Sequence, residues 1–306
     1  MSLLYLSHPD CLAHQMQPGH PERPDRLRAI DAHLARTGLQ QSLEPLQAAP
    51  IAADSLSPTH QTSYLRSLTD RSPSRGLVPV DPDTALCPAS LSAARLAAGA
   101  VVEAVARVFE APGRRAFCAV RPPGHHAERD AAMGFCFYNS IALGADAALT
   151  RPGIERVAIL DFDVHHGNGT VDIFRDRPEV LVCSSFQHPF YPYRLADIVR
   201  PNIINTPLDA GTGSAGFRRR ISADWLPALE RHRPQLILVS AGFDAHREDP
   251  LGGLDLDEED FRWITALIRD AADHYCEGRI VSALEGGYDL DALARSVHAH
   301  LQALLD

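Results

Sequence analysis

The sequence predicts an α/β fold in which helices flank a parallel β-sheet. Short apolar runs alternate along the chain with longer amphipathic runs, and this alternation is typical of βαβ units. The apolar runs are rich in Val, Ile and Leu and carry few polar residues on either face, as expected for strands buried on both sides. Strands are predicted at 116–121, 156–162, 180–185, 203–206, 235–241 and 279–284.

Helices are predicted between and after these strands. The segment 90–110 is rich in alanine and has apolar residues at helical spacing. Similar spacing predicts further helices at 214–232, 257–276 and 291–305. Asp257 and Asp291 are candidate N-caps of the last two, because a carboxylate there accepts the free backbone N–H groups of the first turn.

The segment 71–86 is rich in Ser, Pro and Gly and is predicted to be a loop. A linker between two domains is an open alternative at this point. However, the chain before it has too few predicted strands to form a sheet of its own. We therefore expect a single domain over residues 1–306.

Composition excludes several classes of function. The chain is 45% hydrophobic and 22% charged, which fits a globular protein with a sizeable core. The formal net charge of -10 argues against a nonspecific nucleic-acid binder, and no apolar run approaches the roughly 18 residues of a membrane span. The 6 cysteines form no C-x-x-C pair, so neither a zinc finger nor a disulfide framework is expected. A cytoplasmic location is expected.

Polar residues follow four of the predicted strands. The carboxyl ends of parallel strands meet at one edge of the sheet, which is where α/β folds bind ligands. Packing in the core would instead place apolar residues there. The four segments are RPPGHHAE from residue 121, DFDVHHGNGT from 161, GFDAHREDPLGG from 242 and EGGYDL from 285.

A metal site is predicted in the second and third of these segments. Alternation along an extended strand would turn Asp161, Asp163 and His165 to one side, and Asp244 ends another strand. Such converging groups are costly unless a cation balances them. One histidine and two carboxylates leave an open coordination position, as catalytic zinc or ferrous iron requires. A solvated D-x-H segment is the alternative if Asp244 lies elsewhere.

The other two segments supply candidate acid–base groups. The turn after Pro-Pro-Gly would let both His125 and His126 reach the metal, where a neutral imidazole can take a proton from water. Tyr288 follows two glycines, and a phenol beside a metal can polarise a carbonyl. A surface histidine pair and a plain glycine turn are the alternatives. His166 is expected to be structural, since it points away from His165 in an extended chain.

Five segments together resemble the histone deacetylase family and its bacterial relatives. They are RPPGHHA, GFCFYNSIA, DFDVHHGNGT, SAGFDAHREDPLGG and LEGGYDL, in the family's order, and HPERPDRL at 20–27 resembles the class II branch. The resemblance covers nearly the whole chain. It implies a single three-layer α/β domain of the arginase–deacetylase type, with a mainly parallel eight-stranded sheet flanked by helices.

The resemblance implies a role for each matching residue. Asp163, His165 and Asp244 match the zinc ligands. His126 matches the general base and His125 its electrostatic or acid partner, while Tyr288 matches the residue that polarises the carbonyl. Asp161 would orient His125, and Asn168 would orient His126. Substrate contacts would come from Gly134, Phe135, Tyr191, Leu251 (the gatekeeper position), Gly286 and Gly287.

Two structural monovalent cations, K⁺ or Na⁺, are also implied. The first would be bound by Asp161, Asp163, His165, Ser184 and Ser185. The second would be bound by the backbone carbonyls of Phe174, Arg177 and Val180. The chain departs from its bacterial class II relatives in the loop after Tyr191, where 193–197 replaces a longer Gly-rich stretch and is expected to alter the pocket.

The expected function is zinc-dependent hydrolysis of acetyl or related acyl groups from lysine side chains of proteins or peptides. Leu251 is apolar where a polyamine would favour a carboxylate, but Glu248 and Asp249 keep an acetylpolyamine or another small N-acyl amide open. An arginase-like ureohydrolase would need further Asp and His motifs. A catalytically silent acetyl-lysine binder would lack Tyr288, His126 or a ligand. The oligomeric state is open, with a homodimer or a homotetramer as candidates.

Overall fold

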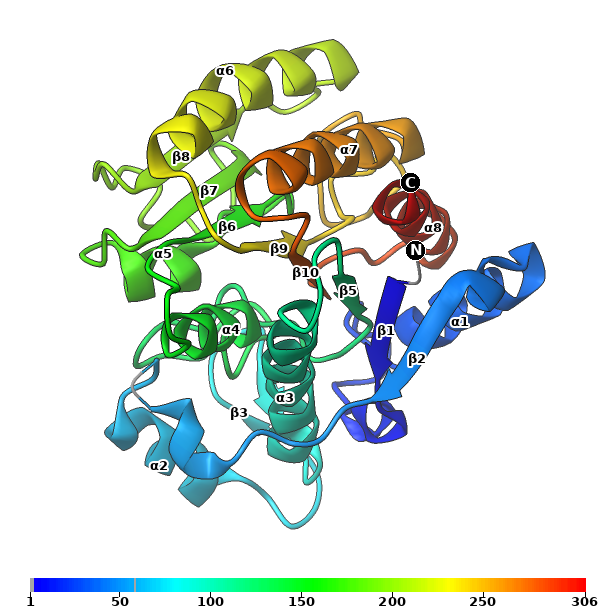
Figure 1. Ribbon diagram of the computed structural model, residues 1–306. Coiled ribbons are helices and arrows are strands. Elements are labelled where there is room, and N and C mark those ends of the chain that lie inside the picture. The colour runs from blue at the N-terminus through cyan, green and yellow to red at the C-terminus, as the bar shows by residue number, and fades with distance from the viewer. Residues whose placement is uncertain (1–2, 58) are drawn as a thin grey trace.

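The computed structural model, which describes residues 3–57 and 59–306, is built around one eight-stranded sheet (Figure 1). The strand order is β2-β1-β5-β10-β9-β6-β7-β8, and all neighbouring strands run parallel. The strands are β1 (Leu3–Ser7), β2 (Leu43–Gln47), β5 (Arg115–Cys118), β6 (Val157–Asp161), β7 (Val180–Gln187), β8 (Ile203–Leu208), β9 (Ile237–Ala241) and β10 (Ile280–Leu284). The predicted fold class is therefore confirmed.

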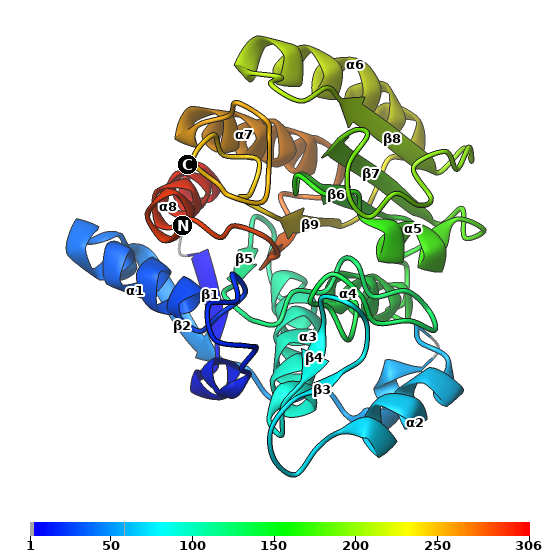
Figure 2. The ribbon, with the colours of Figure 1, turned by 180° about the vertical axis from the view of Figure 1, so that it is seen from behind.

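Helices cover both faces of this sheet and complete a three-layer domain (Figures 1 and 2). The helices α1, α6, α7 and α8 lie on one face, and α3, α4 and α5 lie on the other. Their bounds are α1 (Asp25–Thr37), α2 (Thr62–Arg71), α3 (Ser90–Val108), α4 (Ser140–Leu149), α5 (Asn168–Phe174), α6 (Ser214–His232), α7 (Glu258–Tyr275) and α8 (Leu290–Leu305). Short 3-10 turns occur at η1 (Pro9–Ala13), η2 (Leu39–Ser42) and η3 (Ala53–Leu56).

Among the helix caps, one expectation is confirmed and one is wrong. Asp257 caps α7 in a capping box, in which its carboxylate accepts from the backbone of Glu259 at 3.1 Å. Asp289, and not Asp291, caps α8 by accepting from the backbone of Ala292 at 2.9 Å. The helix begins at Leu290, so Asp291 already lies in its first turn.

The interpretation of 71–86 as an interdomain linker is also wrong. This segment contains a two-stranded antiparallel hairpin, β3 (Val78–Pro79) with β4 (Ala85–Leu86). Tyr64 and Leu68 before it share one buried hydrophobic cluster with Ala94 and Ala98 after it. Because one core spans both sides of the segment, no domain boundary falls there.

The four strands followed by polar segments are the four central neighbours β5, β10, β9 and β6. Their parallel pairing brings the four carboxyl ends together at one edge of the sheet, in the middle of the molecule. Within the described residues, no helix has the length and apolar character needed to cross a membrane.

Candidate metal centre

Three side chains converge at that edge with one metal-binding atom each. The ligand atoms of Asp163, His165 and Asp244 lie within 4.8 Å of one another. The Nδ1 atom of His165 is 3.1 Å from Asp163 Oδ1 and 3.1 Å from Asp244 Oδ2. Both carboxylates are fully buried. Their other oxygens accept from backbone N–H groups, Asp163 Oδ2 from Gly286 at 2.8 Å and Asp244 Oδ1 from Val164 at 2.8 Å.

The charges of this cluster call for a cation. Burial and the charge of Asp163 raise the pKa of Asp244 to about 7. Burial lowers the pKa of His165, but its hydrogen bonds to the two carboxylates outweigh that effect and raise the pKa to about 10. Both shifts show that the site favours added positive charge. One imidazole and two carboxylates with an open side fit zinc or ferrous iron.

The backbone reaches this arrangement by bending, contrary to the extended strand predicted through His165. Strand β6 ends at Asp161. Asp161 Oδ1 accepts from the backbone of Asp163 at 3.1 Å, and Asp163 Oδ1 accepts from the backbone of His165 at 2.9 Å. Such local side-chain bonds compete with the strand ladder and turn the chain. The convergence therefore comes from two consecutive side-chain turns and not from strand alternation.

Glycines let the neighbouring loops approach the two carboxylates. A Cβ atom at Gly242 would collide with Asp163 Oδ2, and one at Gly286 would collide with Asp244 Oδ2. Gly287 has φ +120°, and its carbonyl accepts from Arg26 Nε at 2.7 Å. Gly286 and Gly287, expected to contact substrate, do not line the cavity described below. Gly286 faces the carboxylates of Asp244 and Asp163, and Gly287 faces Leu293 and Phe243.

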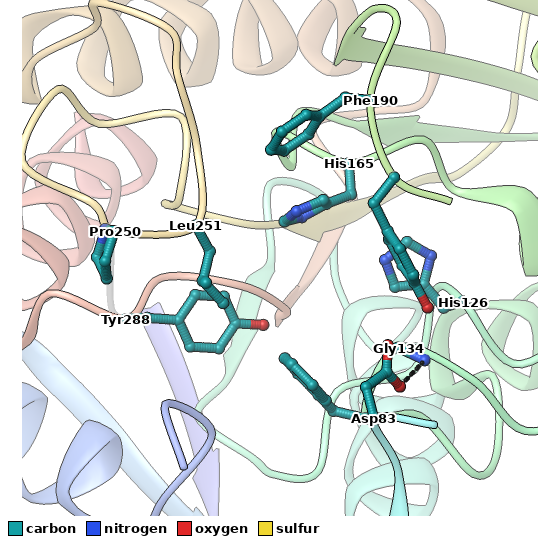
Figure 3. A pocket seen from close by; sticks show the side chains of 10 residues that line it. Asp83, His126, Gly134, His165, Phe190, Pro250, Leu251 and Tyr288 are labelled. Atoms are coloured by element: carbon teal, nitrogen blue, oxygen red, sulfur yellow. Dashed lines mark hydrogen bonds between the residues drawn. The ribbon is translucent and has the colours of Figure 1, made fainter. Parts of the chain in front are cut away.

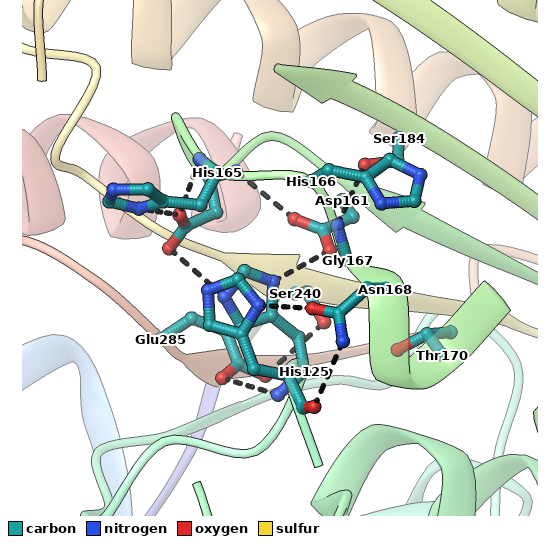
Figure 4. Close-up of polar contacts among 12 residues, drawn as sticks. His125, Asp161, His165, His166, Gly167, Asn168, Thr170, Ser184, Ser240 and Glu285 are labelled. Carbon is teal, nitrogen blue, oxygen red and sulfur yellow. Dashed lines mark hydrogen bonds and ion pairs between the residues drawn. The ribbon is translucent and has the colours of Figure 1, made fainter. Parts of the chain in front are cut away.

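The two histidines lie side by side beside the metal ligands, with ring centroids 4.0 Å apart. The Nδ1 of His125 is 2.9 Å from Asp161 Oδ2, and the Nδ1 of His126 is 2.6 Å from Asn168 Oδ1 (Figure 4). Burial lowers the pKa of His125, but the charges of Asp163 and Asp161 outweigh it and raise the pKa well above its usual value. Burial and the charge of His125 lower the pKa of His126 well below its usual value. The pair thus favours one charged and one neutral imidazole.

A buried carboxylate missed at the sequence level fixes the backbone of this pair. Glu285 Oε2 accepts from the backbone N–H groups of Gly124 at 2.6 Å and His125 at 3.1 Å. Ser240 donates to its other oxygen at 3.2 Å. His166 faces the other way, as expected, and its Nε2 lies 3.0 Å from Asn205 Oδ1.

A cavity of 280 Å³ opens beside His165 (Figure 3). The Tyr288 hydroxyl points across it towards His165 and His126. The predicted wall residues Gly134, Phe135, Tyr191 and Leu251 all line this cavity. The full lining is Asp83, His126, Gly134, Phe135, His165, Phe190, Tyr191, Pro250, Leu251 and Tyr288.

Three lining residues, Asp83, Phe190 and Pro250, were not predicted. Phe190 stacks on His165 with a centroid distance of 5.4 Å, and Asp83 Oδ1 accepts from the backbone of Gly134 at 3.1 Å. Asp83 lies in the segment predicted only as a loop, so nothing local in the sequence signals its position.

Glu248 and Asp249, the two acids near Leu251, both interact with other parts of the chain. Asp249 is 6% exposed and accepts from the backbone of Tyr288 at 2.6 Å and of Leu251 at 2.9 Å. Glu248 pairs with Arg295 at 2.9 Å. Asp249 therefore holds the Tyr288 loop and does not present its charge to the cavity.

The residues expected to bind the first monovalent cation lie together. Ser184 pairs with Asp161 in the β6–β7 register, and Ser185 Oγ lies 3.5 Å from the Asp161 carbonyl. Asp163 and His165 follow directly in the chain. The binding of K⁺ or Na⁺ by these residues stays a prediction.

The residues expected to bind the second cation do not fit one. The carbonyls of Phe174, Arg177 and Val180 do converge, but on the side-chain amide of Asn202. Its Nδ2 lies 2.9, 3.1 and 2.9 Å from these three oxygens. The amide nitrogen thus fills the centre that a cation would need.

Comparison with known proteins agrees with this geometry. The histone deacetylase domain matches residues 20–304. This chain belongs to the histone deacetylase family. It is similar to the histone deacetylase-like amidohydrolase of Pseudomonas aeruginosa, with 40% identity over 88% of this chain and 73% of the relative. It is also similar to the mouse polyamine deacetylase HDAC10, with 36% identity over 93% of this chain and 45% of the relative.

The fold is that of a solved family member. The crystal structure of the HDA15 HD domain matches with a TM-score of 0.93 and 34% identity, over 99% of this chain and 88% of that one. Histone deacetylases are generally metal-dependent, and the Asp163, His165 and Asp244 cluster lies where such a metal would be needed. The chain is therefore a hydrolase that acts on amides.

Proposed function

We propose that this protein is a zinc-dependent deacetylase that removes acetyl groups from lysine side chains of proteins or peptides. The observation that carries the proposal is that His165, one of the three clustered candidate ligands, lines the same cavity as His126 and Tyr288. The same three ligands would also suit ferrous iron, which is the alternative metal.

Each surrounding side chain has a task in hydrolysis. When bound, the metal supplies a Lewis acid that activates water and polarises the acetyl carbonyl. His126 is held neutral and takes a proton from the attacking water through Nε2. Asp161 holds His125 charged through Nδ1, and the proton on Nε2 is the one that His125 gives to the leaving amine. The Tyr288 hydroxyl donates to the oxygen that becomes negative.

The cavity suits an acyl-lysine better than a cationic polyamine. Phe135, Tyr191 and Leu251 give it apolar walls for the lysine methylene groups. Glu248 and Asp249, which kept the polyamine alternative open, are engaged with Arg295 and with backbone N–H groups. Asp83 is the observation that favours an acetylpolyamine as the second candidate, because its carboxylate lines the cavity.

Two other classes of function have less support. A ureohydrolase of the arginase type needs two metals, and the described residues hold one group of at least three metal-ligating side chains. A silent binder would have lost a catalytic group, whereas His126, Tyr288 and the three ligands are all in place.

The test is a substrate panel on zinc-loaded and iron-loaded protein. Acetyl-lysine peptides, acetylated polyamines and longer acyl-lysine peptides are compared by kcat/KM, with Asp244→Asn as the control that lacks a ligand. Fastest turnover of acetyl-lysine peptides supports the proposal. Faster turnover of acetylpolyamines would replace it with the second candidate, and peptide binding without turnover would indicate a silent binder.

A further inference from the structure

A buried carboxylate lies behind the residue that orients His126. Glu128 is 3% exposed, and its Oε1 accepts from Asn168 Nδ2 at 2.7 Å. Its other oxygen, Oε2, pairs with Arg194 Nη2 at 3.0 Å. The chain of contacts therefore runs from the surface arginine through Glu128 and Asn168 to His126.

The side chain of Asn168 needs such a partner because its two ends differ. Its Oδ1 only accepts hydrogen bonds and its Nδ2 only donates. With Oδ1 at 2.6 Å from His126, the imidazole must carry its proton on Nδ1, which leaves Nε2 free. If the side-chain amide of Asn168 were rotated by about 180°, its Nδ2 would face His126 and would favour a proton on Nε2 of the imidazole instead.

Glu128 decides between these two orientations. An ionised carboxylate only accepts hydrogen bonds, so it attracts Nδ2 of Asn168 and repels Oδ1. An aspartate at position 168 would accept from His126 without help. An asparagine depends on its neighbour for the same result.

The pKa of Glu128 lies above its ordinary value, and the charge of Arg194 opposes this rise. Burial raises the pKa of Glu128, and the charges of Asp172 and Asp130 act in the same direction. The hydrogen bond from Asn168 and the charge of Arg194 lower it. Arg194 comes from the shortened loop after Tyr191, between Tyr193 and Leu195, which both have positive φ. This loop therefore delivers a cation to the outer end of the contact chain.

We propose that Arg194 and Glu128 are positioning residues that fix the amide of Asn168 and thereby hold His126 with its proton on Nδ1. The role of Nε2 as a base rests on the proposed deacetylase function, whereas the position of the proton does not. The loop after Tyr191 thus contributes to the site from behind the histidine, although residues 193–197 do not line the cavity.

The orienting role is tested by introducing Glu128→Gln into the natural protein and into the Asn168→Asp variant. The substitution should change kcat/KM in opposite directions in the two. In the natural protein, the amide of Glu128→Gln can either accept from or donate to Asn168, so it no longer selects one orientation of that side chain. We expect kcat/KM to fall by about 10-fold, the lower end of the effects seen when residues behind a ligand or base are replaced. In an Asn168→Asp background, Glu128 faces a second carboxylate, and Glu128→Gln supplies a donor, so kcat/KM should rise. A fall in both backgrounds, with unchanged thermal melting, would mean that Glu128 only supports the fold and would overturn the proposal.

The arginine is tested by its charge. Arg194→Met should lower kcat with little change in KM, and Arg194→Lys should retain most of the activity. Arg200→Met is the matched control, since Arg200 lies in the same region but pairs with the exposed Asp176 at 3.2 Å. Equal activity in Arg194→Met and the wild type would remove Arg194 from the proposal.

Histidine ¹⁵N NMR of the zinc-loaded protein provides a readout that needs no turnover. The His126 signal should show a proton on Nδ1 and none on Nε2, and Glu128→Gln should weaken this preference. A wild-type signal with the proton on Nε2 overturns the proposal. The expected signal in a protein that hydrolyses no acylated substrate would reject the deacetylase function and keep the positioning role.

Discussion

Removal of the Tyr288 hydroxyl is the sharpest test of the proposed chemistry. The Tyr288→Phe variant keeps the ring, which packs edge-on against Phe135 at 5.8 Å and lies under the Arg26 guanidinium at 4.8 Å. Its backbone N–H keeps its bond to Asp249. The variant therefore loses only the hydroxyl that points across the cavity (Figure 3).

The expected loss follows from that single donor. Burial raises the pKa of Tyr288 well above its usual value, so the phenol stays neutral and able to donate. One oxyanion donor contributes ~10²–10³-fold to kcat, about 3–4 kcal/mol. The loss should appear in kcat and not in KM, because the donor acts on charge that develops in the transition state.

The assay is steady-state kinetics of the zinc-loaded enzyme on an acetyl-lysine peptide, together with thermal melting. Tyr191→Phe is the matched control, since it removes a second phenol from the same cavity. Its hydroxyl interacts with Asp83 and not with the candidate metal ligands, so kcat should fall far less than in Tyr288→Phe. A Tyr288→Phe enzyme with the wild-type kcat, or an equal loss in Tyr191→Phe, would refute the assigned role.

Three further predictions concern the metal, an internal amide and a buried ion pair. Asp244→Asn should lower zinc content after dialysis, measured by elemental analysis, while melting in the presence of excess zinc stays cooperative; full zinc retention would contradict the ligand role. Asn202→Leu leaves the carbonyls of Phe174, Arg177 and Val180 without their donor and should cost about 1–3 kcal/mol of unfolding free energy, in part restored by KCl if a cation can then enter. Burial raises the pKa of Glu22, but the charges of Arg121 and His14 outweigh this and lower the pKa to about 2. The contribution of ionised Glu22 to the free energy of unfolding is therefore complete above the ordinary pKa of 4.5 and is lost as the pH falls towards 2. Urea unfolding should show that the free energy of unfolding falls by roughly 3 kcal/mol between these pH values, and that Glu22→Gln abolishes this fall. The same dependence on pH in Glu22→Gln as in the wild type would refute the assignment.

Buried strands were the elements that the sequence predicted best. The predicted segments at 116–121, 156–162, 180–185, 203–206, 235–241 and 279–284 all overlap observed strands, and every residue of β5, β6, β7, β9 and β10 is buried. The edge strand β2 was missed, since none of its residues is fully buried and its third residue is a proline. Strand β1 was missed as well. It has only 5 residues, a length at which an apolar run does not separate a strand from part of a helix.

The candidate ligands could also be predicted. Neighbouring parallel strands end at the same edge of the sheet, so the polar residues that follow them lie close together. Asp163, His165 and Asp244 needed only that rule and the ligand chemistry of zinc. The path of the backbone was predicted wrongly. Side-chain bonds from Asp161 and Asp163 turn the chain where alternation would have kept it straight.

The sequence by itself determined the fold class, the edge of the sheet that carries the chemistry, and the residue types around the metal. Tertiary structure alone decided what each polar group faces. It brought Asp83 into the cavity, placed Asn202 among three carbonyls, and connected Arg194 through Glu128 to Asn168. The physical reason is that burial patterns are repeated locally along the chain, whereas hydrogen-bond partners are chosen by the packing of loops that are distant in sequence.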